Sequence, residues 1–357
     1  MTSTGDAATT AGIGLPAVVR RHPVSSSLVT GAVGVAVVVL SIALAVTVGP
    51  ADIGFADVWG SVAAHLGLGT TPLSPLRDGI VWELRLPRIL TAAAVGAGLA
   101  ISGAIMQAIT RNPLADPYLL GLSSGASLGA VAVLLLGVGL LLPPAAFLGA
   151  LAALGATLLL ARAGGSLSPT RTVLAGIAVS ALAGALTSLV IFWTATGDSY
   201  REILSWLLGS VAGARWPAAA IAIGALIVIG VPLLAGARTL DAFAFGDTAA
   251  SALGIDVTLS RWLLLTATAL LTGAMVSVSG SIGFVGLVVP HAVRLVVGAR
   301  HRVLLPLSAL TGAVFLIWAD TLARSLFDPR ELPVGIVTAI VGAPVFALLL
   351  LRRRAAQ

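Results

Sequence analysis

The sequence predicts an all-α, polytopic membrane protein with about ten transmembrane helices. Hydrophobic residues make up 58% of the 357 residues, charged residues only 10%, and the mean hydropathy is +1.07. A water-soluble domain could not hide so much apolar surface, so lipid must be the solvent for most of the chain. Each crossing of a hydrocarbon layer roughly 30 Å thick needs about 20 apolar residues, and stretches of that length recur along the sequence.

Ten such stretches follow one another. They lie near 28–48, 88–109, 118–138, 144–161, 172–194, 217–235, 261–278, 282–298, 303–323 and 333–351. The eighth is short and rich in glycine, which favours a broken or tilted helix. The sequence therefore predicts a single transmembrane domain over 28–354, preceded by a polar, disordered cytoplasmic tail over 1–27.

The placement of arginine predicts which side of the membrane the termini occupy. All twenty basic residues are arginine. With the N-terminus inside, thirteen of them fall on inner segments and seven on outer segments, and cytoplasmic segments carry the excess of positive charge. We therefore expect a multi-pass protein of the cytoplasmic membrane with both termini in the cytoplasm. The net charge of +6 has the same source, so it does not indicate binding to nucleic acid.

The residues that are missing argue against an enzyme. A P-loop needs a lysine on the nucleotide phosphates, and this chain has no lysine, so an ATPase that drives it would be a separate polypeptide. Cysteine is absent and the four histidines are scattered, without a His-Glu-x-x-His pattern. We expect no resident metal, no cofactor bound by this chain and no catalytic residues.

Three apolar stretches carry glycine and proline where a plain anchoring helix would not. They are NPLADPYLLGLSSGASLG (112–129), SGSIGFVGLVVPHAVR (279–294) and ELPVGIVTAIVGAPVFALLLLRRR (331–354). Glycine lets another backbone or a solute come close, and proline at membrane depth removes a hydrogen bond that neighbours must replace. The pattern favours a transport pore, and packing of helices through small residues is the alternative.

The longest inner connection, 237–260, predicts two short helices. Gly246, Asp247 and Thr248 offer a cap for the second helix, and Gly254 is placed to end it. A helix of small residues with few charges can sit in a groove of a partner protein. A solvated loop helix without a partner is the alternative.

Together with RLPR (85–88) and WLLGSVAG (206–213), these motifs resemble the permease subunit of the type II ABC importers for iron chelates, haem and cobalamin. The resemblance covers about 28–352. It implies the type II ABC importer permease fold and a pore subunit that translocates a ferric siderophore or a related metal chelate. Haem or cobalamin is the alternative cargo.

The resemblance also implies partners. They are two ATPase subunits that hold ATP and Mg²⁺, an extracytoplasmic substrate-binding protein, and a second permease in a homodimer or heterodimer. It assigns ATPase coupling to Gly246, Asp247, Ala250, Leu253 and Gly254, and docking of the binding protein to Arg85, Arg88 and Arg324. It assigns the translocation path or its gate to Asn112, Pro113, Asp116, Tyr118, Ser123, Ser124, Gly283, Gly286 and Pro290.

Other interpretations of single residues stay open. The docking arginines could simply extend their side chains to the membrane interface. Asp320, the acid inside a span, is expected to pair with Arg324 four residues later, whereas a proton-relay acid there would indicate an ion-coupled secondary transporter. His291 is expected to be structural rather than a haem ligand. A structural or signalling membrane subunit is a third class, but it would not need glycine-broken spans.

Overall fold

The computed structural model describes residues 24–49, 51–138, 141–163, 168–194, 197–327 and 330–354, and in these ranges every regular element is a helix. Most of the predicted tail, 1–23, lies outside the described residues. The helices are α1 (Val24–Thr47), α2 (Phe55–His65), α3 (Pro75–Gly79), η1 (Ile80–Arg85), α4 (Leu86–Ile109), η2 (Pro117–Leu120), α5 (Leu122–Leu135), α6 (Leu142–Ala163), α7 (Pro169–Thr194), α8 (Gly197–Leu207), α9 (Trp216–Ala225), η4 (Leu226–Gly230), α10 (Val231–Ala235), α11 (Ala237–Phe243), α12 (Asp247–Ala252), α13 (Val257–Ser279), α14 (Val285–Val297), α15 (His301–Ser325) and α16 (Val334–Arg354).

The predicted spans appear in the predicted order. In the described part of the chain, seven helices are long and apolar enough to cross a membrane, and α5, α14 and α16 are shorter apolar helices. The short, broken eighth span is α14, as expected. This arrangement makes the chain a multi-pass membrane protein.

Three predicted boundaries were wrong. The second span is continuous from Pro75 to Ile109, because α3, η1 and α4 join into one helix. The third begins only at Leu122, because Gly121 takes a left-handed φ of 81° between η2 and α5. Helix α1 begins at Val24, inside the stretch predicted as tail.

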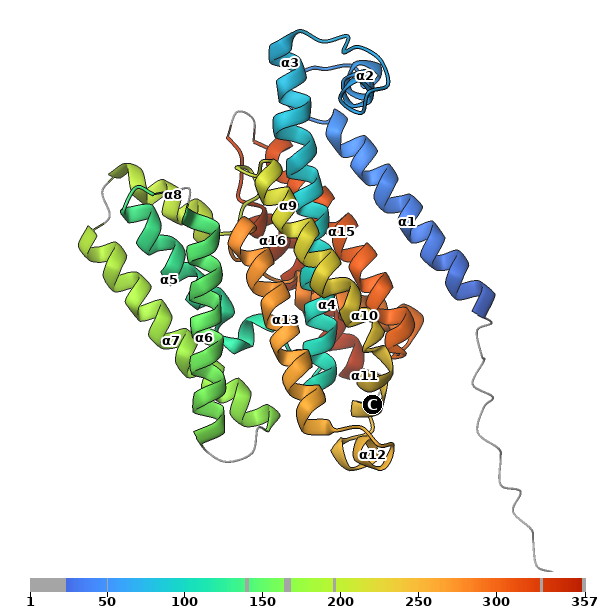
Figure 1. Cartoon of the computed structure of the whole chain (residues 1–357), viewed down its shortest axis with the longest axis vertical. Coiled ribbons are helices and arrows are strands. Elements are labelled where there is room, and N and C mark those ends of the chain that lie inside the picture. Colours follow the sequence, from blue (N-terminus) through green and yellow to red (C-terminus); the bar gives the residue numbers. More distant parts are fainter. Residues whose placement is uncertain are drawn as a thin grey trace, which may run out of the picture.

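Helix α4 is the centre of the bundle, with 89% of its most apolar window buried. It packs against α13, α14 and α15 on different sides, and α1 stands at the edge of the molecule with most of its valines and leucines exposed (Figure 1). A Cβ atom at Gly103 would collide with the carbonyl oxygen of Gly286 in α14, and one at Gly96 would collide with that of Gly312 in α15. Glycine therefore lets the backbones of α4, α14 and α15 approach one another directly.

The two ends of the bundle differ. Helices α2 and α3 lie at one end and α12 lies at the other, and α1 slopes from the end with α2 toward the end with α12 (Figure 1). Helices α5 to α8, drawn in green, form a group beside α13 and α4. We call the end with α2 and α3 the outer end, and the end with α12 the inner end.

Candidate functional site

The backbone between α13 and α14 is not helical over residues 280–284. Gly280 ends α13 with a φ of 65°, and Phe284 takes a left-handed φ of 68° just before α14 begins. A bulky residue in the left-handed region is unusual and persists only where the surroundings hold it. Backbone groups at membrane depth also need partners from neighbouring segments, because lipid supplies none.

Those partners come from the other motifs singled out in the sequence. The hydroxyl of Tyr118 donates to the carbonyl oxygen of Ile282 at 3.0 Å. The hydroxyl of Ser123 donates to the hydroxyl oxygen of Ser281 at 2.6 Å. The amide of Ser210 donates to the carbonyl oxygen of Ser279 at 2.8 Å. The break at 280–284 is thus held by η2, α5 and the turn after α8.

Glycine brings a fourth segment, α16, against the same place. The amide of Gly335 donates to the carbonyl oxygen of Gly209 at 3.1 Å. A Cβ atom at Gly280 would collide with the carbonyl oxygen of Trp206, and one at Gly342 would collide with the side chain of Phe284. Segments that are distant in the sequence therefore converge on residues 280–284.

The predicted path residues divide into two groups. Tyr118 and Ser123 contact the break, and Gly283 has open space where a Cβ atom would stand. Gly286 and Pro290 are buried in helix packing, which fits the alternative interpretation. The remaining members, Asn112, Pro113, Asp116 and Ser124, lie partly or fully exposed around η2 and the start of α5. A path or gate role for these residues stays a prediction.

Asp116 caps η2 and lies outside the spanning helices. Its Oδ1 accepts from the amide of Tyr118 at 2.8 Å. Although part of the residue is exposed, desolvation by the segments packed around the Asp116 carboxyl raises its pKa to about 6, and the bond from Tyr118 acts in the opposite direction. The carboxyl therefore titrates much closer to neutral pH than an exposed aspartate does.

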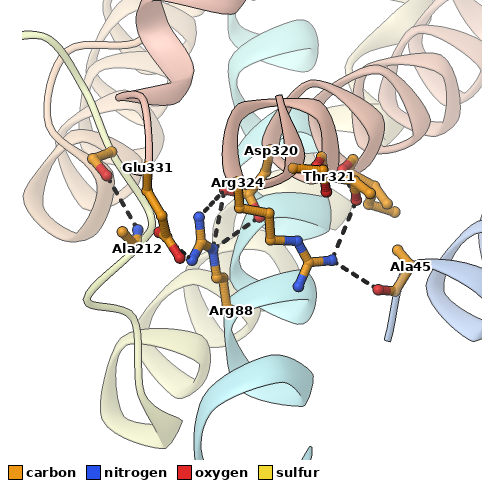
Figure 2. A network of polar contacts seen from close by, with 10 residues as sticks. Ala45, Arg88, Ala212, Asp320, Thr321, Arg324 and Glu331 are labelled. Carbon is orange, nitrogen blue, oxygen red and sulfur yellow. Dashed lines mark hydrogen bonds and ion pairs between the residues drawn. The ribbon is translucent and has the colours of Figure 1, made fainter. Parts of the chain in front are cut away.

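A buried network of charged side chains lies near the outer end (Figure 2). Arg88 donates to Asp320 through Nε and Nη2 at 2.9–3.1 Å, and through Nη1 to Glu331 at 2.7 Å. The predicted pairing of Asp320 with Arg324 was wrong, because Arg88 reaches the carboxylate from a different helix. Asp320 is 1% exposed and held in a fork-shaped ion pair, which does not favour a proton-relay role.

Arg85 and Arg324 are bound to backbone rather than offered to a partner. Arg324 donates to the carbonyl oxygen of Ala45 at 2.7 Å, and Arg85 donates to those of Val46 at 3.3 Å and Ala51 at 2.5 Å. All three arginines predicted to dock a binding protein are therefore buried in this chain instead of displayed on its surface. Whether a binding protein uses them stays a prediction.

The inner connection forms two short helices, α11 and α12, as predicted. Gly246 and Gly254 flank α12 with φ angles of 97° and 80°, which glycine adopts readily. Asp247 caps nothing through its side chain and instead pairs with Arg261 at 2.8 Å, contrary to expectation. Ala250 was wrongly assigned to a partner-facing surface, because its side chain is fully buried.

Apart from Leu259 in the first turn of α13, the exposed large apolar side chains of this connection are Leu253, predicted from the sequence, and Phe245, which sequence reasoning missed. They are 70% and 80% exposed. A phenylalanine that follows a helix and precedes a glycine at the inner end is a signal that could have indicated it. We call Phe245 and Leu253 the inner apolar pair.

Among the described residues, no group of three or more His, Asp or Glu side chains is placed to hold a metal ion. His291 is buried in α14. Helices that cross a membrane, break around a glycine-lined centre and present apolar side chains at one end define a membrane permease. The chain belongs to the FecCD transport family, whose pattern it matches over residues 37–352.

Named relatives cover most of the chain. It is 42% identical over 330 residues to the uncharacterized ABC transporter permease protein YvrB of Bacillus subtilis, covering 90% of this chain and 93% of the relative. It is 48% identical over 273 residues to the cobalamin import system permease protein BtuC of Halobacterium salinarum, covering 76% of this chain and 73% of that protein.

The fold also matches a solved structure described as an inward-facing, metal-chelate type ABC transporter. The TM-score is 0.80 with 32% sequence identity, over 91% of this chain and 99% of that one. The chain therefore has the type II ABC importer permease fold that the sequence motifs implied.

Proposed function

We propose that this chain is the pore subunit of an ATP-driven importer that carries a metal chelate across the cytoplasmic membrane. The observation that carries the proposal is the convergence of η2, α5, α16 and the turn after α8 on the helix break at 280–284. Broken helices at membrane depth are where transporters place their substrate paths, and Gly283 borders open space at this break.

Two ATPase subunits are proposed to dock at the inner end, on the connection 237–260. The inner apolar pair, Phe245 and Leu253, is exposed there, and exposure of two large apolar side chains to water is unfavourable unless a partner covers them. This assignment keeps Gly246, Asp247 and Gly254 in the coupling segment and places both termini in the cytoplasm. ATP and Mg²⁺ would be held by the ATPase subunits.

An extracytoplasmic binding protein at the outer end and a second permease, identical or related, complete the proposed assembly. ATP-driven closure of the ATPase subunits would shift the permease pair between outward-facing and inward-facing states. Substrate would then pass along the break at 280–284 without being bound tightly.

The cargo class is a large metal chelate. Several relatives at 44–48% identity are named as cobalamin permeases, which favours a corrinoid as the first cargo to test. A ferric siderophore and haem are the next two, because the sequence motifs resemble the permeases for all three. An ion-coupled transporter without an ATPase is disfavoured, because Asp320 is fixed by Arg88.

The test is uptake by proteoliposomes that contain this chain, the ATPase encoded beside it and a binding protein. Radiolabelled cobalamin, a ferric siderophore and haem are supplied in turn, with ATP or a non-hydrolysable analogue inside. Uptake of one chelate that needs ATP hydrolysis supports the proposal. Uptake that follows a proton or sodium gradient without any ATPase contradicts it.

A pair of variants tests the docking surface. Leu253→Arg puts a charge on the inner apolar pair and is expected to abolish co-purification of the ATPase. Val296→Arg is the matched control, because Val296 is 85% exposed near the inner end but lies outside the connection. Equal loss of the ATPase in both variants would contradict docking at 237–260.

A further inference from the structure

A carboxylate of the inner connection binds the first residue of α15. Asp241 in α11 accepts from the backbone amide of His301 at 2.9 Å and from its Nδ1 at 2.7 Å, with Oδ1 receiving both. His301 is the first residue of α15, and the residue before it, Arg300, forms no side-chain cap. Asp241 therefore supplies from another helix the negative cap that α15 lacks.

A second tie joins the connection to α13. Oδ1 of Asp247, the first residue of α12, lies 2.8 Å from Nη2 of Arg261 in α13. The guanidinium carbon of Arg261 also lies 5.6 Å from the ring centroid of Phe243, the last residue of α11. Arg261 is buried and thus contacts both short helices of the connection at once.

The two helices that Asp241 and Asp247 contact, α15 and α13, extend to the buried charged network and to the break at 280–284. Helix α15 has 25 residues and extends about 37 Å toward the outer end, where it carries Asp320 and Arg324. Helix α13 has 23 residues, extends about 35 Å and ends at the break that begins with Gly280. Displacement of the first turn of either helix is passed along its backbone hydrogen bonds, one of which is interrupted in α15 by Pro306.

From these contacts we infer that Asp241 and Asp247 are positioning residues that deliver motion of the ATPase subunits to α15 and α13. This inference rests on the proposed function. The exposed Phe245 lies between Asp241 and Asp247 in the sequence, and Leu253 follows α12. A partner bound to Phe245 and Leu253 would therefore transmit its displacement to both carboxylate contacts. Without the ties, the connection would be joined to the spanning helices through the backbone and apolar packing alone.

The experiment compares cargo taken up per ATP hydrolysed in proteoliposomes of the full assembly. Asp241→Ala and Asp247→Ala are each expected to lower uptake per ATP by about fivefold. Asp241→Ala, at a residue outside the proposed docking residues, is also expected to keep ATPase binding and hydrolysis. Asp247→Glu, which restores the carboxylate, is expected to recover uptake. Asp256→Ala is the matched control, because Asp256 lies in the same connection but caps only its own helix, through the amide of Leu259.

A second measurement separates the ties from the partner. Hydrogen exchange of the α12 amides in the isolated, purified chain should be faster in Asp247→Ala than in Asp256→Ala. Uptake per ATP equal to wild type in both tie variants overturns the inference, as does an equal fall in Asp256→Ala. If the wild-type assembly shows no ATP-driven uptake at all, the proposed function fails first, and faster exchange would then show a tie that only stabilises the fold.

Discussion

Replacement of Arg88 by methionine should be among the most damaging single changes at the outer end. Arg88 makes three contacts of 2.9–3.1 Å to the carboxylate of Asp320, which is 1% exposed. Without the guanidinium, that buried carboxylate loses all three of these hydrogen bonds, and the nearby Arg324 makes none to it in the described residues. Removing one partner of a buried ion pair typically costs about 3–5 kcal/mol, so we expect a free-energy loss in that range.

Glu331→Gln is the matched control. The Glu331 side chain is 37% exposed, and a glutamine oxygen can still accept from Nη1 of Arg88. Partly exposed ion pairs contribute about 1 kcal/mol or less, so this change should have a small effect. The double variant Arg88→Met with Asp320→Leu removes both buried charges and should recover most of the loss.

Thermal unfolding in detergent, followed by the fluorescence of the seven tryptophans, measures these differences. A loss of about 4 kcal/mol corresponds to a fall in Tm of roughly 5 °C for a chain of this size. Equal shifts for Arg88→Met and Glu331→Gln would refute the reasoning. So would a double variant that is no more stable than Arg88→Met.

Three further predictions concern the packing and the break. Gly103→Ala should lower the free energy of unfolding by about 3 kcal/mol, because the added methyl group pushes α4 away from α14. Gly155→Ala, whose methyl group meets open space, should change Tm little. Equal Tm shifts in the two variants would contradict direct backbone packing. Because the folded state raises the pKa of Asp116 to about 6, its protonated form is favoured, and stability falls as pH rises from about 4 to about 6. Asp116→Asn should therefore raise Tm relative to wild type at pH 7 and not at pH 4, and a constant difference across pH would argue against this assignment. Tyr118→Phe leaves a carbonyl of the break unpaired, and should lower Tm by a few degrees and speed hydrogen exchange at 280–284; unchanged exchange would show that the hydroxyl is not what holds the break.

The positions of the spanning helices could be predicted from local features of the sequence. Apolar stretches of spanning length located the helices, and glycine marked the short eighth span and the end of α12 at Gly254. The continuous helix from Pro75 was missed because its polar first turns resemble a loop. The motifs around 280–284 were singled out separately, but nothing in the sequence showed that they would meet.

Long-range pairing was the main failure. Asp320 was assigned to Arg324 because a four-residue separation places two side chains on one helix face, yet Arg88 lies 232 positions away and makes the better fork. Ala250 was assigned to ATPase coupling by resemblance alone, and a six-residue helix has too few turns for the sequence to show that this side chain is buried. Both errors arise where tertiary packing overrides a local rule.

The same separation of 232 residues bears on how the chain is assembled in the membrane. Arg88 is translated long before Asp320, and at about 5–20 residues per second the interval is roughly 10 to 50 s. During that time a guanidinium near the end of the second span has no carboxylate to neutralise it, and arginine inside lipid is unfavourable. We therefore expect Arg88 to stay near the polar surface or beside the insertion machinery until the ninth span supplies Asp320.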